Sequence, residues 1–364
     1  MKIALVHDHL TQKGGAEKVL EAMAELYPEA PIFTLVHDPA TFQSANKIHT
    51  SFLQKLTRNK DKFQWLLPLM PTATEHHDLK NFDIVISSSS IFAKGVITQP
   101  NTLHICYCHT PPRFLWLDYH SYVKELKTNK LIKKILPIIL TRLRQWDRLA
   151  ASRVNYFIAN SHEVQRRIAH FYNRPSEVIH PPVDTSKFHI STKNDGYYLA
   201  GGRLVSYKRF DIIVTAFNRL NMELKIFGTG PELNKLREMA KPNIEFLGQI
   251  SDKDKPNLYS HALAFINPQV EDFGITAVEA MASGRPVIAL RAGGAKETVI
   301  EGQTGMFFNE QCWEDLADAI LRFKPENFDP QKIREHALHW DKDNFKSKIK
   351  NLIDSKWNSY EHRN

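Results

Sequence analysis

The sequence has few cysteines and no long hydrophobic run, and these two absences exclude several classes of protein. Its three cysteines, Cys106, Cys108 and Cys312, are too few for a disulfide framework, and the Cys-x-Cys pair has no second pair to complete a zinc site. No apolar run reaches the roughly 20 residues that a membrane span requires. The first residues, MKIALVHDHL, become polar too early for a signal peptide. We therefore expect a protein of the reducing cytoplasm.

Three common nucleotide-binding signatures are also missing. The glycine turn FGTGPEL, residues 227–233, has no Lys-Ser or Lys-Thr after it and is not a P-loop. The first predicted strand is not followed by a complete Gly-x-Gly-x-x-Gly, which argues against a nicotinamide-dependent enzyme. The triplet Asp272-Phe273-Gly274 has no His-Arg-Asp loop before it, so it does not indicate a protein kinase.

What the chain does contain is an alternation of short apolar runs and helical patterns. At 364 residues, with 42% hydrophobic and 24% charged residues, it is long enough for two domains of about 150–200 residues each. Runs such as KIALVH, FDIVIS and LHICYC each end in a polar or glycine turn, as is typical of parallel sheets with crossover helices. Paired prolines and polar residues near 180–195 indicate a linker.

We therefore predict an α/β protein with two doubly wound parallel-sheet domains and a ligand site at the carboxyl ends of their strands. The predicted divisions are residues 1–185 and residues 190–340, followed by a C-terminal helix within 341–364. Because the strands of the second domain are used up before this helix begins, we expect it to pack back towards the first domain.

The net charge of +8 is confined to the first half of the chain. Residues 1–189 hold 24 Lys and Arg against 16 Asp and Glu, whereas residues 190–364 hold 24 of each. Residues 122–153 hold nine basic and two acidic residues, with Leu and Ile clusters interrupted by Pro137. This pattern predicts one or two amphipathic helices, which lie either in an anionic membrane interface or on their own domain. Nucleic acid is not expected, because no nucleic-acid-binding motif accompanies the charge.

Two segments of the second half place candidate binding groups where predicted strands end. In GGRLVSYKR, Arg203 lies in a strand-to-helix turn and Lys208 lies near the start of the next helix, whose unpaired N–H groups also favour anions. Such a set can bind a diphosphate without a metal, and the alternative is a solvated basic helix. FGTGPEL places Gly228 and Gly230 in another turn of this kind, where glycine alone is weak evidence for a site.

The segment VEDFGITAVEAMASGRP carries two glutamates, Glu271 and Glu279, eight positions apart. We expect a turn at 272–275 and a helix at 276–283, so that the first N–H groups of the helix point towards a ligand. Glu271, at the rim, can accept hydrogen bonds from ligand hydroxyls. Glu279 can accept from a vicinal diol such as a ribose, and the alternative is a residue of the helix surface. Its small apolar neighbours make an unpaired carboxylate costly there.

The candidate residues of the first half also follow predicted strands. Gly14 and Gly15 open a helix after the first strand, and His109 follows the strand LHICYC. A histidine in this position is either a ligand-binding group or a satisfied polar cap. Asp8, at the end of the first strand, could contact an acceptor substrate, and Lys13 beside the glycines is ambiguous in the same way.

Together, Gly14-Gly15, CHTPPRFLW, GGRLVSYKR, FGTGPEL and EDFGITAVEAMASGRPVIA resemble glycosyltransferase family 4 over nearly the whole chain. That family has the GT-B fold and transfers sugars from nucleotide donors with retention of the anomeric configuration. Its E-x7-E spacing is met by Glu271 and Glu279. The segments HDHLTQKGGAEKVLE and CHTPPRFLWLDY further resemble a bacterial branch whose members are often GDP-mannose-dependent and build O-antigen or other surface polysaccharide.

The resemblance implies a role for each candidate residue. Arg203 and Lys208 would bind the donor diphosphate and stabilise it as the leaving group, so no metal and no cofactor is implied. The implied catalytic residues are Arg203, Lys208, Glu271 and His109. The implied donor-binding residues are Gly14, Gly15, Gly228, Gly230, Phe273, Gly274, Ile275 and Glu279, with Phe246 and Ile250 lining the base. Asp8 and Lys13 are the candidates for acceptor binding.

The implied reaction moves a hexose, with mannose from GDP-mannose as the first choice, to a glycan or to an undecaprenyl-diphosphate-linked oligosaccharide. Only the branch resemblance favours GDP over UDP. Three alternatives stay open: a transferase that uses a UDP-sugar, a nucleotide-sugar 2-epimerase of the same fold, and a non-enzymatic membrane-associated scaffold for polysaccharide assembly. We expect the protein in the cytoplasm, with peripheral attachment to the inner face of the cytoplasmic membrane as a further expectation.

Overall fold

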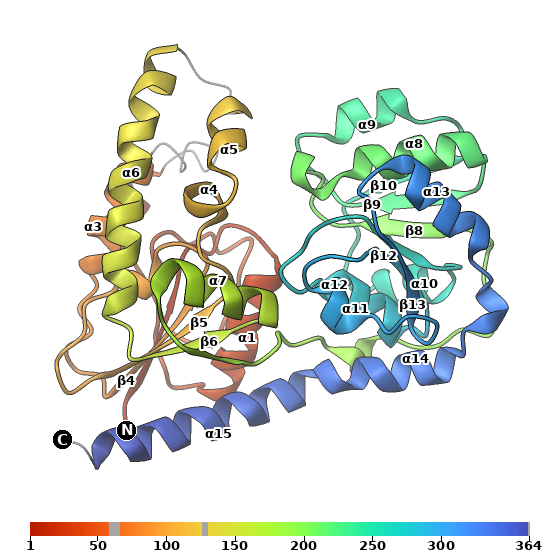
Figure 1. The fold of residues 1–364 in the computed structure, drawn as a ribbon. Helices are drawn as coiled ribbons and strands as arrows, with labels where there is room; N and C mark the ends of the chain where they lie inside the picture. Colours follow the sequence, from red (N-terminus) through yellow and green to blue (C-terminus); the bar gives the residue numbers. More distant parts are fainter. Residues whose placement is uncertain (58–65, 126–129, 363–364) are drawn as a thin grey trace. The chain divides into compact units, whose positions relative to one another are not determined.

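The computed structural model describes residues 1–57, 66–125 and 130–362 and divides into two compact units. The first unit comprises Met1–His180 and Phe345–Asn364, and the second comprises Pro181–Asn344. Each unit contains one parallel sheet flanked by helices (Figure 1). The predicted class, two doubly wound α/β domains, is therefore confirmed.

The first unit is built on a seven-stranded parallel sheet in the order β3-β2-β1-β4-β5-β6-β7. Its central strands are buried along almost their whole length, as expected of a parallel sheet covered on both faces. The strands are β1 (Ile3–His7), β2 (Ile32–Thr34), β3 (Ile48–Thr50), β4 (Ile84–Ser89), β5 (Leu103–Cys108), β6 (Tyr156–Ala159) and β7 (Ser176–Val178).

Alternate residues of β5 enter two separate cores, because successive side chains of a strand point to opposite faces. Ile105 and Tyr107 share a core with α1 and α15, whereas Cys106 and Cys108 pack with residues of α7. The helices of this unit are α1 (Gly15–Leu26), α2 (Leu53–Leu56), α3 (Met70–Glu75), α4 (Arg113–Trp116), α5 (Tyr119–Glu125), α6 (Lys130–Ser152), α7 (His162–Tyr172) and α15 (Lys342–Glu361).

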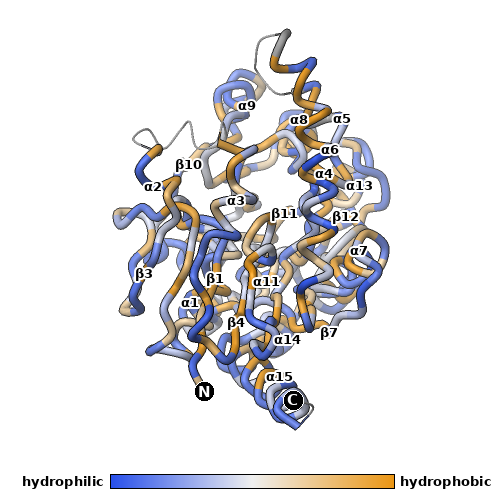
Figure 2. Tube along the Cα trace, turned by 90° about the vertical axis from the view of Figure 1, so that its left-hand side faces the viewer, coloured by the Kyte–Doolittle hydropathy of each residue, from blue (hydrophilic) through white to orange (hydrophobic). Residues whose placement is uncertain are grey.

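The predicted amphipathic segment forms α5 and α6, and Pro137 lies inside α6 without ending it. Residues 126–129 of this segment lie outside the described part. Hydrophilic and hydrophobic stretches alternate along α6 (Figure 2). One side of the helix is docked on its own unit, since Leu136, Leu140 and Leu143 are buried in a shared core.

The second unit is built on a six-stranded parallel sheet in the order β10-β9-β8-β11-β12-β13. The strands are β8 (Tyr198–Gly201), β9 (Leu224–Phe227), β10 (Ile244–Gly248), β11 (Phe265–Asn267), β12 (Val287–Leu290) and β13 (Gly305–Phe308). The helices are α8 (Phe210–Leu220), α9 (Leu233–Met239), α10 (Lys255–Ser260), α11 (Ile275–Ala282), α12 (Ala295–Thr298), α13 (Trp313–Arg322) and α14 (Pro330–Ala337).

In the structure the first compact unit ends at His180, a few residues before the division predicted at residue 185. The chain after His180 already belongs to the second unit: Val183 is buried in that unit's core, and its N–H donates to the carbonyl of Trp340, distant in the sequence, at 2.9 Å. The chain returns to the first unit within α15. There, Phe345 and Ile349 are buried in the core that α1 forms with the sheet.

Candidate active site

The loop after β8 carries both cations predicted to bind a diphosphate. Arg203 is exposed on this loop. Lys208 ends a single 3-10 turn, Ser206–Lys208, and helix α8 begins two residues later, at Phe210. Arg209, between them, has φ +55°, and this left-handed residue turns the chain from the loop into the helix.

Lys208 forms an ion pair with Glu271, the first carboxylate of the E-x7-E spacing. Its Nζ donates to Oε1 of Glu271 at 2.7 Å, and the side chains are only 13% and 17% exposed. Burial opposes the charge on Lys208, but the charge and hydrogen bond of Glu271 outweigh it, so the pKa of Lys208 lies above its usual value. Lys208 therefore remains a cation at the carboxyl end of the sheet.

The loop that carries Glu271 is fixed by glycines on both sides. Gly274 has φ +96° and leads directly into α11, so the helix starts one residue earlier than predicted. Gly293 and Gly294 lie under the loop, where a Cβ atom would approach the carbonyl oxygen of Glu271 to 2.3 Å and the Cα atom of Phe273 to 2.4 Å. The sequence interpretation missed these two glycines, although the GG in RAGGAKE was a visible signal.

Glu279 is on α11 and is 1% exposed, so it is not a residue of the helix surface. The hydroxyl of Tyr259 donates to its Oε2 at 3.1 Å. The carboxylate therefore has the hydrogen bond that its apolar surroundings require. Its predicted contact with a ribose stays a prediction.

Gly228 and Gly230 have a structural explanation. A Cβ atom at Gly228 would lie 1.8 Å from the carbonyl oxygen of Gly202, and one at Gly230 would lie 2.2 Å from that of Leu204. The N–H of Leu204 also donates to the carbonyl of Thr229 at 2.9 Å. The glycines thus allow two backbones to meet, and this contact holds the Arg203 loop in place.

Phe246 and Ile250, the residues predicted to line the base, pack in different places. Phe246 lies against the core that contains α8 and α13, whereas Ile250 lies against the core that contains α11 and α14. The two side chains therefore belong to opposite faces of the sheet. Their predicted role in lining the base stays a prediction.

Four buried oxygen atoms near the Glu271 loop have no hydrogen-bond donor in the described part of the chain. They are Oδ1 of Asn267, Oε1 of Gln269, Oε2 of Glu271 and Oγ1 of Thr276. Buried acceptors of this kind are rare because they cost free energy unless they are paired. A ligand rich in hydroxyl groups would supply the missing donors. The alternating polar residues of NPQVE were the available signal for the first two.

The carboxylate of Asp8, in the first unit, is occupied by hydrogen bonds within that unit. Its carboxylate accepts four backbone N–H groups at 2.6–2.9 Å, from residues 90 and 91 on Oδ2 and from residues 92 and 93 on Oδ1. The side chain is 4% exposed. These bonds fix the loop after β4 and leave little capacity for an acceptor hydroxyl, so the geometry favours a structural role.

The glycine pair and Lys13 lie where α1 begins. Gly14 is the N-cap of the helix and Gly15 its first residue, while Lys13 is exposed. A Cβ atom at Gly14 would lie 2.9 Å from Oε2 of Glu17. A side chain at this position would therefore require the Glu17 carboxylate to shift.

His109 directly follows β5 and is 8% exposed. Its Nε2 lies 2.8 Å from the hydroxyl of Ser88, at the end of neighbouring β4. Burial, the largest effect, and the nearby His7 lower the pKa of His109 to about 4. His109 is therefore a neutral imidazole at physiological pH, which suits a hydrogen-bonding group better than an anion-binding cation.

Each unit thus gathers its own candidates at the carboxyl ends of its strands: Lys208, Glu271 and the start of α11 in the second, and His109 with the start of α1 in the first. Within the described residues, no group of three or more His, Cys, Asp or Glu is placed to hold a metal ion. Nor is any described helix long and apolar enough to cross a membrane.

Two α/β units, each built on one parallel sheet, are the arrangement of the GT-B glycosyltransferases. Family models match both halves: "Glycosyltransferase Family 4" matches residues 13–187, and "Glycosyl transferases group 1" matches residues 184–340. The chain belongs to glycosyltransferase family 4, as its motifs predicted.

Curated relatives match parts of the chain. It is 34% identical over 136 residues to the GDP-mannose-dependent alpha-(1-6)-phosphatidylinositol monomannoside mannosyltransferase of Mycobacterium tuberculosis. The aligned residues cover 32% of this chain and 35% of that relative. It is 27% identical over 228 residues to the O-antigen chain mannosyltransferase RfbU of Salmonella typhimurium, which covers 57% and 61%. The match spans between a third and about half of the length of the first curated relatives.

Solved structures show the fold over the whole chain. Sucrose-phosphate synthase from Thermosynechococcus elongatus has a TM-score of 0.77 and 18% identity, over 99% of this chain and 100% of its own. The Anabaena protein HepE, solved with UDP and glucose, has a TM-score of 0.72 and 18% identity, over 98% and 100%. The GT-B fold is therefore confirmed.

Proposed function

We propose that this protein is a retaining hexosyltransferase that transfers mannose from GDP-mannose to a glycan or an undecaprenyl-diphosphate-linked oligosaccharide in bacterial surface polysaccharide synthesis. The observation that carries the proposal is the Lys208–Glu271 pair, with Nζ and Oε1 2.7 Å apart and Oε2 of Glu271 buried without a donor. A lysine held as a cation suits a diphosphate, and an acceptor without a donor suits a sugar hydroxyl.

The proposed mechanism is electrostatic. When the bond between the sugar and the diphosphate breaks, negative charge develops on the leaving phosphate, and Lys208 and Arg203 stabilise it. The N–H groups at the start of α11 add positive potential at the same strand ends. Glu271 orients the sugar through its hydroxyls, and Glu279 binds the ribose. Because these cations supply the charge, the proposal requires no metal ion.

The donor base is decided by resemblance and not by a residue. The mycobacterial relative is named as GDP-mannose-dependent, whereas HepE was solved with UDP. These names support GDP-mannose as the first choice and a UDP-sugar as the alternative. A 2-epimerase of the same fold would use water as its only acceptor, and a scaffold would use no donor at all.

Isothermal titration with GDP, UDP and ADP tests the donor class, and Arg203→Ala and Glu279→Ala test the residue roles. We expect one diphosphate, GDP, to bind the unchanged protein and to bind both variants at least about tenfold more weakly, as loss of a charged hydrogen bond predicts. Tight binding of UDP alone would select the UDP-sugar alternative. If no diphosphate binds, the scaffold alternative is favoured, and nucleotide release that does not depend on added glycan acceptor would favour the epimerase.

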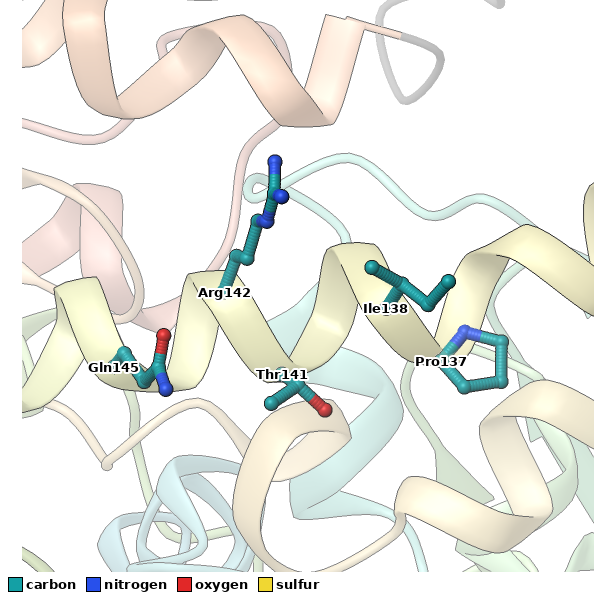
Figure 3. A pocket seen from close by; sticks show the side chains of 5 residues that line it. All are labelled: Pro137, Ile138, Thr141, Arg142 and Gln145. Carbon is teal, nitrogen blue, oxygen red and sulfur yellow. The ribbon is translucent and has the colours of Figure 1, made fainter.

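Helix α6 is the surface that we propose for an anionic membrane and a lipid-linked acceptor. Ile135 and Ile138 are 45% and 59% exposed on the side of the helix that is not docked. Ile138, Arg142 and Gln145 project from α6 along one open hollow (Figure 3). Exposed isoleucines between basic side chains can enter a headgroup region, with the lysines near the phosphates.

Binding to vesicles tests this surface. Lys133→Glu combined with Lys134→Glu should weaken binding to vesicles of anionic lipid at low salt by more than about tenfold, since each lysine contributes about 1 kcal/mol near such a surface. Lys348→Glu with Lys350→Glu makes the same charge change on exposed positions of α15 and should weaken binding much less. Equal losses in both variants, or no binding by the unchanged protein, would contradict the proposal.

A further inference from the structure

A row of four buried polar residues in the first unit ends at His109. Ser88 Oγ lies 2.8 Å from Nε2 of His109 and 3.1 Å from Nδ1 of His7. Nε2 of His7 lies 3.7 Å from Oε1 of Glu17, at ion-pair distance and longer than a tight hydrogen bond. All four side chains are at most 8% exposed. Such a row inside the protein is a chain of linked polar contacts and not a set of separate surface groups.

The fold brings the row together from four elements. His7 ends β1, His109 follows β5, and Ser88 lies near the end of β4, the strand between them, where it pairs in register with His7. Glu17 is in the first turn of α1. Gly14, one turn earlier, leaves room for its carboxylate, since a Cβ atom there would lie 2.9 Å from Oε2.

Glu17 determines which groups donate and which groups accept the hydrogen bonds along this row. Burial opposes its ionisation, but the nearby His7 outweighs this effect, so the pKa of Glu17 lies below its ordinary value. A carboxylate can only accept, so it favours a hydrogen on the facing Nε2 of His7. When His7 carries no charge, its Nδ1 is then an acceptor, and the hydroxyl of Ser88 donates to it.

The hydrogen bonds of Ser88 then determine which ring nitrogen of His109 carries the hydrogen. The Ser88 oxygen, having donated its hydrogen to His7, accepts the N–H of His109 Nε2. In a neutral imidazole the other nitrogen is then unprotonated. No described residue forms a hydrogen bond with Nδ1 of His109. Nδ1 of His104 also has no partner, but unlike Nδ1 of His109 it is among the buried atoms without a hydrogen bond.

We propose that Glu17, His7 and Ser88 are positioning residues that hold His109 in its Nε2–H tautomer, so that Nδ1 accepts a hydrogen bond from a hydroxyl of the bound substrate. The proposal deepens the proposed function and rests on it for the identity of the ligand, a sugar or its acceptor. The tautomer itself is a property of the unliganded protein and can be measured without activity.

The chain offers a matched control in the neighbouring residue of β4. Ser87 Oγ lies 2.8 Å from Nε2 of His104, the same contact on the opposite face of the sheet and outside the row. Ser87→Ala and Ser88→Ala therefore remove the same hydroxyl, from the same strand, beside a buried histidine. Only Ser88→Ala interrupts the row to His109.

The first measurement is nitrogen-15 NMR of the histidine side chains in the unliganded protein. We expect His109 to be Nε2–H in the unchanged protein and in Ser87→Ala, and to show an increased Nδ1–H population in Ser88→Ala. Glu17→Gln, which keeps the shape of the side chain, should have the same effect if Ser88→Ala does not fold. An Nδ1–H tautomer in the unchanged protein, or a ratio that neither variant alters, would overturn the proposal.

The second measurement is sugar transfer from the donor that binds. Ser88→Ala and Glu17→Gln should lower kcat/KM by about threefold to tenfold, the loss expected for one weakened hydrogen bond, and leave the affinity for the free nucleoside diphosphate unchanged. Ser87→Ala should leave both unchanged. A normal kcat/KM in variants whose tautomer has shifted would overturn the substrate contact. Absence of transfer by the unchanged protein would instead refute the proposed function and leave the NMR result to judge the tautomer.

Discussion

The two units use their polar residues at the strand ends in different ways. In the first unit, Asp8 is saturated by four backbone N–H groups, and Lys94 forms a buried ion pair with Asp147, with both side chains 1% exposed. In the second unit, Arg203 is exposed, and the pair of Lys208 and Glu271 remains partly accessible. The first unit thus uses these charges within its own fold, whereas the second leaves its candidate charges at least partly accessible.

This difference shows that position at a strand end does not by itself make a charged residue part of a site. What separates Asp8 from Glu271 is the number of donors already bound. Asp8 has four, whereas Oε2 of Glu271 has none among the described residues. A carboxylate with an unsatisfied oxygen gains free energy from a ligand hydroxyl, and a saturated one does not.

The largest expected effect is on catalysis in the second unit. Lys208→Ala should lower kcat by about 10²–10³-fold, because a fixed charge that stabilises the leaving group in a water-poor site contributes about this much. The measurement is the rate of sugar transfer from the donor that binds. Lys235→Ala, a 65% exposed lysine beside Glu232, should change the rate less than twofold. A normal rate of sugar transfer in Lys208→Ala would show that this charge of the second unit is as structural as those of the first.

A smaller effect is expected on the stability of the second unit. Gly228→Ala should destabilise it by about 2–4 kcal/mol, because the residue has φ +112° and its Cβ atom would meet the oxygen of Gly202 at 1.8 Å. Gly248→Ala is the control, since Gly248 has φ +69° but nothing within 4 Å of the added atom, and should cost about 1 kcal/mol. Denaturant unfolding distinguishes the two. Equal losses would show that strain in φ, and not contact between the loops, explains Gly228.

The smallest of the three effects concerns Asp8. Asp8→Asn should destabilise the first unit by about 2 kcal/mol at pH 7, because at least one backbone N–H loses its acceptor. Burial raises the pKa of Asp8, but His7 and the backbone N–H groups of residues 93 and 90 outweigh it, so the pKa lies below 3.8. Its contribution is therefore complete above pH 3.8 and is lost as the pH falls through the lower folded value.

Denaturant unfolding between pH 7 and pH 2 measures this contribution. The unchanged protein should lose more stability on acidification than Asp8→Asn does. Asp78→Asn, at a position whose side chain is 65% exposed, serves as the control and should change stability by less than about 0.5 kcal/mol. A transfer rate that falls in Asp8→Asn while the stability is unchanged would restore the predicted role in acceptor binding.

Much of the fold follows from local patterns. The C-terminal helix expected within residues 341–364 is α15, Lys342–Glu361. The boundary at His180 did not follow, because it depends on the N–H of Val183 meeting the carbonyl of Trp340, more than 150 residues away. Pro137 suggested an interruption, but the docked side of α6 continues through it.

The candidate site divides in the same way. The spacing of Glu271 and Glu279 and the basic residues of GGRLVSYKR were visible as motifs. Residues that act by close approach were not, since Gly293 and Gly294 lie under the Glu271 loop only after β12 and β11 pair. Asp8 is the opposite case. Its place at a strand end suggested a site residue, but backbone N–H groups of the loop after β4 already bind its carboxylate.

By itself, the sequence determined the two-domain α/β class, membership of glycosyltransferase family 4, and which residues could carry charge at the strand ends. These depend on residue type and spacing along the chain. Only the tertiary structure decided which of those groups is available, and that Glu17, His7 and Ser88 lead to His109. The physical reason is that burial and hydrogen-bond saturation are set by neighbours distant in the sequence, so residue type and spacing do not show which polar atoms can still bind a ligand.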